Sequence, residues 1–247
     1  MTEKTLTPLR PSIVVDGVHK RFILNHAFSL KDTVVAWVRG RSTSSSFEAL
    51  KGLDLVIDEG ESVAVLGLNG SGKSTLLKLI SGVMQPDEGR VLTRGRVAGL
   101  IEVGAGFHPE LSGRENVFLN AAILGMSRKE IEARYDEIVA FSEIEEFIDQ
   151  EVKHYSSGMF MRLAFSVAIH VELDILLVDE ILSVGDAPFR EKCRQKFAEL
   201  IQARKTLVVV SHDMDMVREL CTRGVVINKG EMIYDGPVEG AIALVES

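Results

Sequence analysis

The sequence predicts an α/β fold in which a largely parallel sheet carries an inserted helical region. Short apolar runs return along the chain, as in strands that are buried on both faces. A strand-rich beginning is followed by a helical pattern between about 111 and 172, and then by alternating strand-like and helix-like segments. The 247 residues fit one large domain, or a core with a small subdomain.

The first predicted elements are strands. Residues 12–18 (SIVVDGV) and 50–58 (LKGLDLVID) have strand patterns, and a turn is expected at Glu59-Gly60. The next strand, 62–68 (SVAVLGL), is apolar enough to be buried on both faces, as in a parallel sheet.

A segment between the first two strands has a different pattern. Residues 29–40 (SLKDTVVAWVRG) place apolar side chains, including Trp37, at helical spacing, and the serine-rich run 42–46 predicts a flexible link. The apolar face and its flanking cations suit a membrane interface or a partner helix. Packing on the protein's own core is an equal alternative.

The helical middle and the end of the chain follow. Residues 127–144 predict a helix, with Ser127 and Glu130 forming a capping box at its start. A further helix is expected within 194–205. Strand signals return at 174–180, 206–212 and 224–230.

Composition excludes several classes of protein. Hydrophobic residues make up 46% and charged residues 26%, which is typical of soluble globular proteins. The net charge of −8 argues against a nucleic-acid partner. Cys193 and Cys221 give neither a disulfide framework nor a metal-binding spacing. Neither a secretory signal nor a transmembrane helix is predicted.

The glycine-rich segment GLNGSGKS (67–74) fits the phosphate-binding pattern G-x-x-x-x-G-K-[ST], the P-loop. It follows a predicted strand and precedes a helical pattern, which is the context that this pattern requires. Backbone N–H groups can then bind phosphate oxygens, Lys73 can bridge the β- and γ-phosphates of ATP, and Ser74 can bind Mg²⁺. The predicted nucleotide-binding residues here are Gly67, Asn69, Gly70, Ser71, Gly72, Lys73, Ser74 and Thr75.

Two further strands end in chemically useful residues. LDILLVDE (173–180) ends in Asp179, suited to holding Mg²⁺ through water, and Glu180, suited to orienting the attacking water as a base. TLVVVSHD (206–213) carries His212 at the carboxyl end of a parallel strand, where ligands of open α/β sheets bind. A contact with the γ-phosphate is favoured for His212, although a lone histidine is more often structural.

Together these motifs resemble the nucleotide-binding subunits of ABC transporters. The fold implied is a P-loop NTPase core with an antiparallel β subdomain and an inserted helical subdomain. YSSGM (155–159) stands where that family has its LSGGQ motif, with Ser156 and Gly158 matching and Ser157 and Met159 departing from it. A serine and free N–H groups at a helix start form an anion site. An ordinary helix cap is the alternative.

The resemblance also implies a dimer. In the family, the LSGGQ site binds the γ-phosphate of ATP held by the other subunit, so two copies would enclose two ATP molecules head to tail. Asp186 in SVGD (183–186) matches the family's D-loop aspartate. Glu102 is the best substitute for the missing Q-loop glutamine as a metal contact, and Phe22 best fits the adenine-stacking aromatic.

Longer sequence stretches point to one branch of this family. GLIEVGAGFHPELSGREN (99–116), KHYSSGMFMRLAFSVAIH (153–170) and DEILSVGDAPFREKC (179–193) resemble ATP-binding subunits of polysaccharide exporters, over residues 12–240. The implied complex has two such subunits and two membrane permease subunits, at the cytoplasmic face of the plasma membrane, with a lipid-linked polysaccharide as cargo. A coupling helix of the permease would dock after the Q-loop, near Phe107 and His108.

The expected organisation is one nucleotide-binding domain over 1–247. The ATPase core with its β subdomain spans 12–110 and 173–240, and the helical subdomain spans 111–172. No C-terminal carbohydrate-binding domain is expected, because the chain ends 35 residues after His212. The rival hypotheses are a nutrient-importer subunit, a DNA-associated ATPase of ABC type and a small-molecule kinase.

Overall fold

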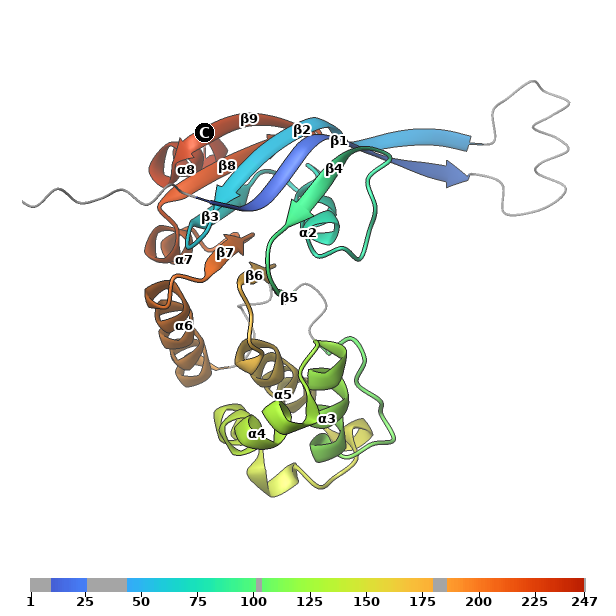
Figure 1. The fold of residues 1–247 in the computed structure, drawn as a ribbon, viewed down its shortest axis with the longest axis vertical. Helices are drawn as coiled ribbons and strands as arrows, with labels where there is room; N and C mark the ends of the chain where they lie inside the picture. Colours follow the sequence, from blue (N-terminus) through green and yellow to red (C-terminus); the bar gives the residue numbers. More distant parts are fainter. Residues whose placement is uncertain (1–9, 26–43, 101–103, 180–185, 247) are drawn as a thin grey trace, which may run out of the picture.

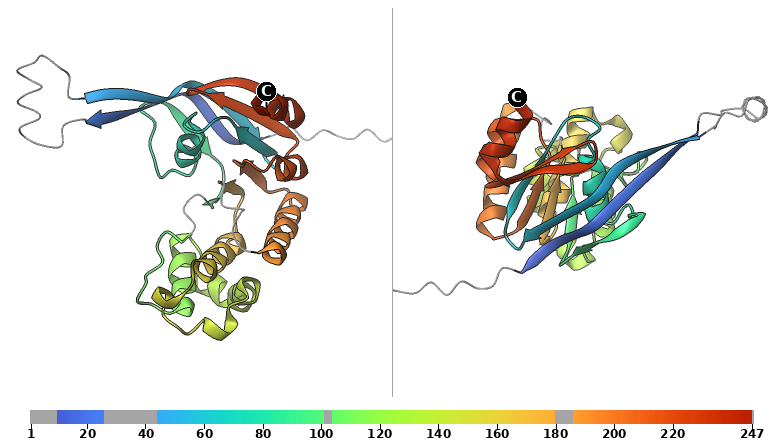
Figure 2. Two further views of the ribbon diagram at one scale, coloured as in Figure 1. Left: turned by 180° about the vertical axis from the view of Figure 1, so that it is seen from behind. Right: turned by 90° about the horizontal axis from the view of Figure 1, so that it is seen from above.

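The computed structural model describes residues 10–25, 44–100, 104–179 and 186–246, which form two sheets and a helical unit (Figure 1). The smaller sheet is antiparallel, in the order β2-β1-β4, with β1 at Pro11–Asn25, β2 at Ser44–Asp58 and β4 at Glu88–Thr93. Strands β1 and β2 continue beyond the body of the protein as a long ribbon (Figure 2).

The larger sheet has the order β5-β6-β7-β3-β8-β9. Strand β9 runs antiparallel to β8, and the other neighbours are parallel. In sheet order, the strands are β5 (Val97–Gly99), β6 (Ile175–Val178), β7 (Thr206–Val209), β3 (Ser62–Leu66), β8 (Arg223–Asn228) and β9 (Glu231–Pro237).

The helices fall into two groups. Those next to the sheets are α2 (Lys73–Ile80), α6 (Ala187–Gln202), α7 (Met214–Leu220) and α8 (Val238–Glu246). The helical unit lies to one side of both sheets (Figure 1). It consists of α3 (Gly113–Ile123), α4 (Arg128–Ser142) and α5 (Ser157–His170), with the short 3₁₀ turns η1 (Glu145–Phe147) and η2 (Val152–His154).

Strand β3 lies between two hydrophobic cores. Ala64 and Leu66 pack in the core formed with helices α5, α6, α7 and α8, whereas Val63 and Val65 pack in the core shared by the two sheets and α2. The alternation follows from the two-residue period of a strand. The prediction that β3 is buried on both faces is confirmed. The helical unit has a third core of its own.

All six predicted strands are present, with shifted ends. The expectation of a flexible link over 42–46 is wrong for its last three residues, because Ser44, Ser45 and Ser46 lie in β2 and pair with β1. The register of the β1–β2 pair overrides the weak strand preference of serine. The predicted helix at 29–40, including Trp37, lies outside the described residues.

Three strands were not predicted. Strand β4 is mostly exposed, β5 has only three residues, and β9 alternates between exposed and half-buried positions at the sheet edge. None has the apolar run that marks a buried strand. Within the described ranges, none of the helices has the length and apolar content of a membrane-spanning segment.

Helix starts in the helical unit are capped as the sequence indicates. Ser127 and Glu130 form the predicted capping box on α4, and Ser112 and Glu115 form a second one on α3. Behind the second box lies the fully buried Asn116. Its amide oxygen accepts from His108 N at 2.6 Å, and its amide nitrogen donates to the carbonyl oxygens of His108, Leu111 and Ser112.

We expect Asn116→Ala to lower the free energy of unfolding by about 2–4 kcal/mol, because it leaves several buried backbone groups without a partner. Urea denaturation followed by circular dichroism measures this change. Ala122→Ser, on the exposed face of the same helix, is the control and should stay within about 0.5 kcal/mol of the parent. Equal stability of the two variants would contradict the role given to Asn116.

Candidate nucleotide-binding site

The loop between β3 and α2 leaves no room for side chains at two positions. Gly67 and Gly72 have φ values of 144° and 116°. A Cβ at Gly67 would collide with the carbonyl oxygen of Ile227, and one at Gly72 would lie 2.6 Å from the carbonyl oxygen of Ala49. Glycine is therefore required where the loop turns back over the sheet.

Two polar side chains of this loop are buried. Lys73 is 7% exposed, and its Nζ donates to the carbonyl oxygens of Gly67 at 2.8 Å and Leu68 at 3.1 Å. The Ser71 hydroxyl is also buried and has no hydrogen-bond partner among the described residues. Buried polar groups are normally satisfied, so an unpaired hydroxyl in a glycine-rich turn fits a loop built to receive an anionic ligand.

A pocket of about 400 Å³ opens beside the loop. Phe22 and Phe47 lie on one side of it, as directly opposed partners on β1 and β2. Opposed residues of an antiparallel pair have their side chains on the same face, which places both rings toward the loop. The other lining residues are Ala49, Asn69, Gly70, Gly72, Lys73, Ser74 and Thr75.

Phe47 was missed by the sequence reasoning. Its ring is about half exposed, at 49%, although it lines the same pocket as Phe22. Only the register of β1 against β2 brings the two rings together, and 25 residues separate them in the sequence. The aromatic residue just before the strand pattern at 50–58 was the available signal.

Asp179 and His212 lie near the carboxyl ends of strands in the large sheet, on the same side of the sheet as the loop. Val178 of β6 and Ala64 of β3 both pair with Val209 of β7, so the carboxyl ends of these parallel strands are adjacent. Asp179 is half-buried and His212 is exposed. The predicted Mg²⁺ contact Glu102 and the predicted base Glu180 lie outside the described residues.

The residues present fit a magnesium ion only in part. The Ser74 hydroxyl and the Asp179 carboxylate are hard oxygen donors, of the kind that Mg²⁺ prefers. The described residues hold no group of three or more acidic, histidine or cysteine side chains arranged for a metal. Mg²⁺ binding stays a prediction.

The YSSGM segment forms the start of α5. Ser156 is the N-cap, and its hydroxyl accepts a hydrogen bond from Met159 N at 3.2 Å. Ser156, Ser157 and Gly158 are all exposed, and none of them lines the P-loop pocket of the same chain. The helix-cap interpretation is therefore correct. The exposed backbone N–H groups also leave an anion-binding helix end open to a ligand from outside the chain.

Asp186 lies at the start of α6. Its carboxylate caps that helix by accepting from Phe189 N at 3.3 Å, and it accepts a second hydrogen bond from Arg162 at 2.7 Å. These contacts hold the pKa of Asp186 below its usual value, with the Phe189 hydrogen bond as the largest cause. Its role as a nucleotide-binding residue of the D-loop stays a prediction.

The two cysteines take no part in this chemistry. Cys193 and Cys221 are buried in the core on the helix-covered face of the large sheet. Burial raises the pKa of both thiols to about 12, so neither forms a reactive thiolate near neutral pH.

A glycine-rich loop between a buried parallel strand and a helix, with Asp179 and His212 at the same edge, defines a P-loop nucleotide-binding protein. Residues 50–183 match the family described as ABC transporter, and the chain belongs to that family. It is accordingly an ATP-binding subunit with ATPase activity, as the motifs predicted.

Relatives with similar sequences indicate which branch of the ABC transporter family this chain resembles. The chain is 42% identical to an O-antigen export system ATP-binding protein RfbB of Klebsiella pneumoniae, over 96% of this chain and 98% of the relative. It is 48% identical to the RfbB protein of Myxococcus xanthus, over 88% of this chain and 50% of that relative. The predicted resemblance to polysaccharide-export subunits is confirmed. The chain spans about half the length of the Myxococcus protein.

Solved structures support the fold. A dimeric bacterial ABC transporter cassette matches with a TM-score of 0.72 and 26% identity, over 92% of this chain and 98% of that one. A dimeric cassette in a post-hydrolysis state, bound to ADP and Pi, matches with a TM-score of 0.71 and 25% identity, with the same coverage. The predicted ABC ATPase fold is confirmed.

We expect Phe22→Ala and Phe47→Ala each to weaken ATP binding by about 5- to 150-fold, since losing an aromatic stacked on a base typically costs about 1–3 kcal/mol. Titration with a fluorescent ATP analogue measures the dissociation constant. Phe147→Ala, which removes a 40% exposed ring from the helical unit, is the matched control. An unchanged dissociation constant in Phe47→Ala would show that the Phe47 ring does not stack on the adenine base of ATP.

Proposed function

We propose that this chain binds and hydrolyses ATP to drive export of a lipid-linked polysaccharide through a membrane permease. The pocket formed by Phe22, Phe47 and the P-loop is the observation that carries the ATP chemistry. The two relatives described above support the cargo, because both are O-antigen export proteins and O-antigen is a polysaccharide. The Klebsiella relative is the stronger support, because this chain covers it almost from end to end.

The catalytic roles that we assign follow from the motifs at the carboxyl ends of the parallel strands. Backbone N–H groups of the P-loop and Lys73 bind the β- and γ-phosphates and offset the negative charge of the transition state. Ser74, Asp179 and Glu102 would hold Mg²⁺, which supplies further charge neutralisation when bound. Glu180 orients the attacking water and accepts its proton, and His212 contacts the γ-phosphate.

Closure of a dimer completes each site. The P-loop pocket of one copy lacks any contribution from its own YSSGM segment, whose exposed helix end is available to a second copy. A head-to-tail pair joins each pocket to the partner's Ser156–Gly158 through a twofold axis. The dimeric cassettes with the same fold support this arrangement.

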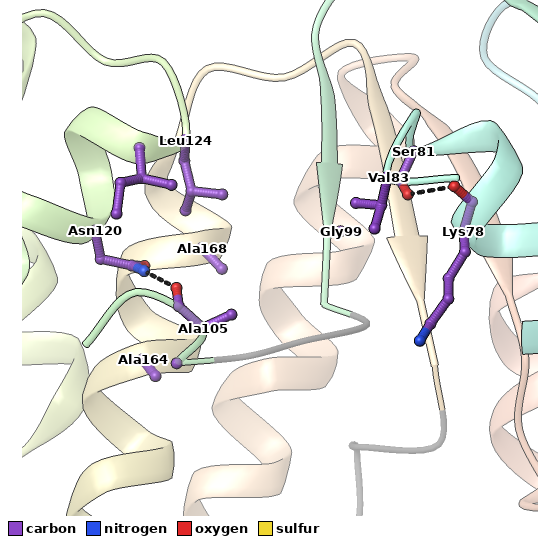
Figure 3. Close-up of a pocket in the computed structure, with 11 residues that line it drawn as sticks. Lys78, Ser81, Val83, Gly99, Ala105, Asn120, Leu124, Ala164 and Ala168 are labelled. Carbon is purple, nitrogen blue, oxygen red and sulfur yellow. Dashed lines mark hydrogen bonds between the residues drawn. The ribbon is translucent and has the colours of Figure 1, made fainter. Parts of the chain in front are cut away.

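A largely apolar pocket of about 240 Å³ is the proposed docking site for the permease (Figure 3). It lies where α3 and α5 face the end of α2 and strand β5. Asn120 donates a hydrogen bond to Ala105 O at 2.8 Å on one wall, and Ile123 and Val83 are 59% and 69% exposed. Family membership argues for an apolar permease helix as its occupant.

The residues that line this pocket do not include the two predicted docking residues, Phe107 and His108. Phe107 is half-buried and packs against Phe160 with ring centroids 5.2 Å apart. His108 is exposed and joins the Asn116 hydrogen bonds through its backbone. Neither residue lines the pocket. Docking there would hold the chain at the cytoplasmic face of the plasma membrane as a peripheral subunit.

We expect Glu180→Gln to reduce ATP hydrolysis by about 10²–10⁴-fold while ATP binding persists, because only the base is lost. The bound ATP should then trap a dimer that light scattering detects. Glu219→Gln, an exposed carboxylate on α7, is the control and should hydrolyse ATP normally. Unchanged hydrolysis in Glu180→Gln would defeat the assignment of the base.

Ser157→Arg in the same trapped background tests the shared site. The long cation adds bulk at the helix end that faces the second nucleotide, so the dimer should fail to form although each monomer still binds ATP. Normal dimerisation and normal hydrolysis in this variant would reject a site shared between two copies.

We expect Ile123→Glu to abolish copurification with the permease, because it places a charge in the apolar docking pocket. The tagged chain is captured from detergent-solubilised membranes, and copurified membrane proteins and glycolipids are identified by mass spectrometry. Leu92→Glu, at a 53% exposed position on β4, is the matched control.

The identity of the copurified partner separates the rival functions. A polysaccharide permease with a lipid-linked glycan supports export, whereas a nutrient permease would overturn the cargo and leave the ATPase intact. ATPase activity stimulated by DNA would favour a DNA-associated ATPase.

A further inference from the structure

Arg162 joins three elements of the fold at one point. It lies in the second turn of α5, and its side chain is only 19% exposed. One guanidinium nitrogen donates to Glu143 at 2.8 Å and the other donates to Asp186 at 2.7 Å. Its planar group also lies over the ring of Phe189, 5.0 Å from the centroid. Contacts of this kind hold the guanidinium in one orientation.

Glu143 ends α4 in a backbone conformation that favours glycine. Its φ is 55°, in the left-handed region. Its carboxylate accepts hydrogen bonds from Lys192 at 2.8 Å as well as from Arg162, and these cations hold its pKa below the usual value, with Lys192 as the largest cause. These two cations therefore hold the Glu143 carboxylate in place beside Arg162. The backbone conformation of Glu143 is one that glycine adopts with less strain.

Asp186 connects Arg162 to the D-loop segment. It is the last residue of SVGD and the N-cap of α6. The Arg162–Asp186 contact therefore ties α5, which begins directly after Ser156, to the helix that follows SVGD. In the proposed dimer, the YSSGM segment of one chain faces the nucleotide held by the other chain, and Asp186 is a predicted nucleotide-binding residue.

We propose that Arg162 is a positioning residue that keeps YSSGM and Asp186 at a fixed spacing, so that both engage the partner's nucleotide together. This inference rests on the proposed ATP-dependent dimer. Arg162 itself touches neither the nucleotide nor the reacting atoms. Its effect is on how much ATP is needed to close the dimer, and ATP binding to the monomer does not depend on it.

The fork of arginine matters for this role. Arg162 reaches two carboxylates with two different nitrogens, 2.8 Å and 2.7 Å away. A lysine in its place has one compact ammonium and cannot reproduce both contacts in the same geometry. Arg162→Lys therefore keeps the charge but cannot hold Glu143 and Asp186 together.

The test measures ATP-induced dimerisation by light scattering in the Glu180→Gln background. We expect Arg162→Gln and Arg162→Lys to raise the ATP concentration for half-maximal dimer formation by about tenfold or more. The dissociation constant of ATP for the monomer should change less than about twofold. Lys192→Gln is the matched control, because it removes the other cation from Glu143 and leaves the Arg162–Asp186 contact in place.

The outcomes separate the two levels of the proposal. If the Glu180→Gln parent forms no dimer with ATP, the proposed function fails and the role of Arg162 fails with it. If the parent closes and both Arg162 variants close at the same ATP concentration, only the positioning role is overturned. An equal loss in Lys192→Gln would assign the effect to general stability of the network and reject the specific role. If Arg162→Gln does not fold, Arg162→Lys decides the question.

Discussion

The site depends on close contact between backbone segments where the P-loop crosses the sheet. Gly67 and Gly72 pass so near the carbonyl oxygens of Ile227 and Ala49 that no side chain fits. One contact joins the loop to β8 and the other joins it to β2, so the loop is held by both sheets at once. Because β3 is buried on both faces, the position where the loop begins is fixed before any ligand arrives.

The same fold separates the P-loop from the YSSGM segment within one chain. The P-loop, Asp179 and His212 lie at the carboxyl edge of the large sheet, whereas Ser156 begins a helix of the separate helical unit. In the proposed dimer, each copy would supply the helix end that the partner's pocket lacks. Twofold symmetry would then link hydrolysis to the distance between the two chains.

Local signals in the sequence predicted the parts of the structure that local chemistry decides. The strand pattern of β3, the P-loop and the Ser127 capping box each depend on neighbours within a few residues, and each is present. The partnership of Phe22 with Phe47 and that of Arg162 with Asp186 were not predicted. The first depends on strand register across a long connection, and the second on how a helix of one unit packs against a helix of the other.

Helix α5 joins the proposed docking pocket to the proposed nucleotide contact at Ser156. Its start carries the exposed Ser156, and its second turn carries Arg162. Farther along, Ala164 lines the proposed docking pocket, Leu163 packs in the core of the helical unit, and Phe165 packs in the core under the large sheet. Close-packed interiors transmit strain because they deform little. In the proposed complex, a permease segment that moves the pocket wall would therefore move Ser156 as well, and closure of the ATP site would move the pocket in return, since coupling between two sites acts in both directions.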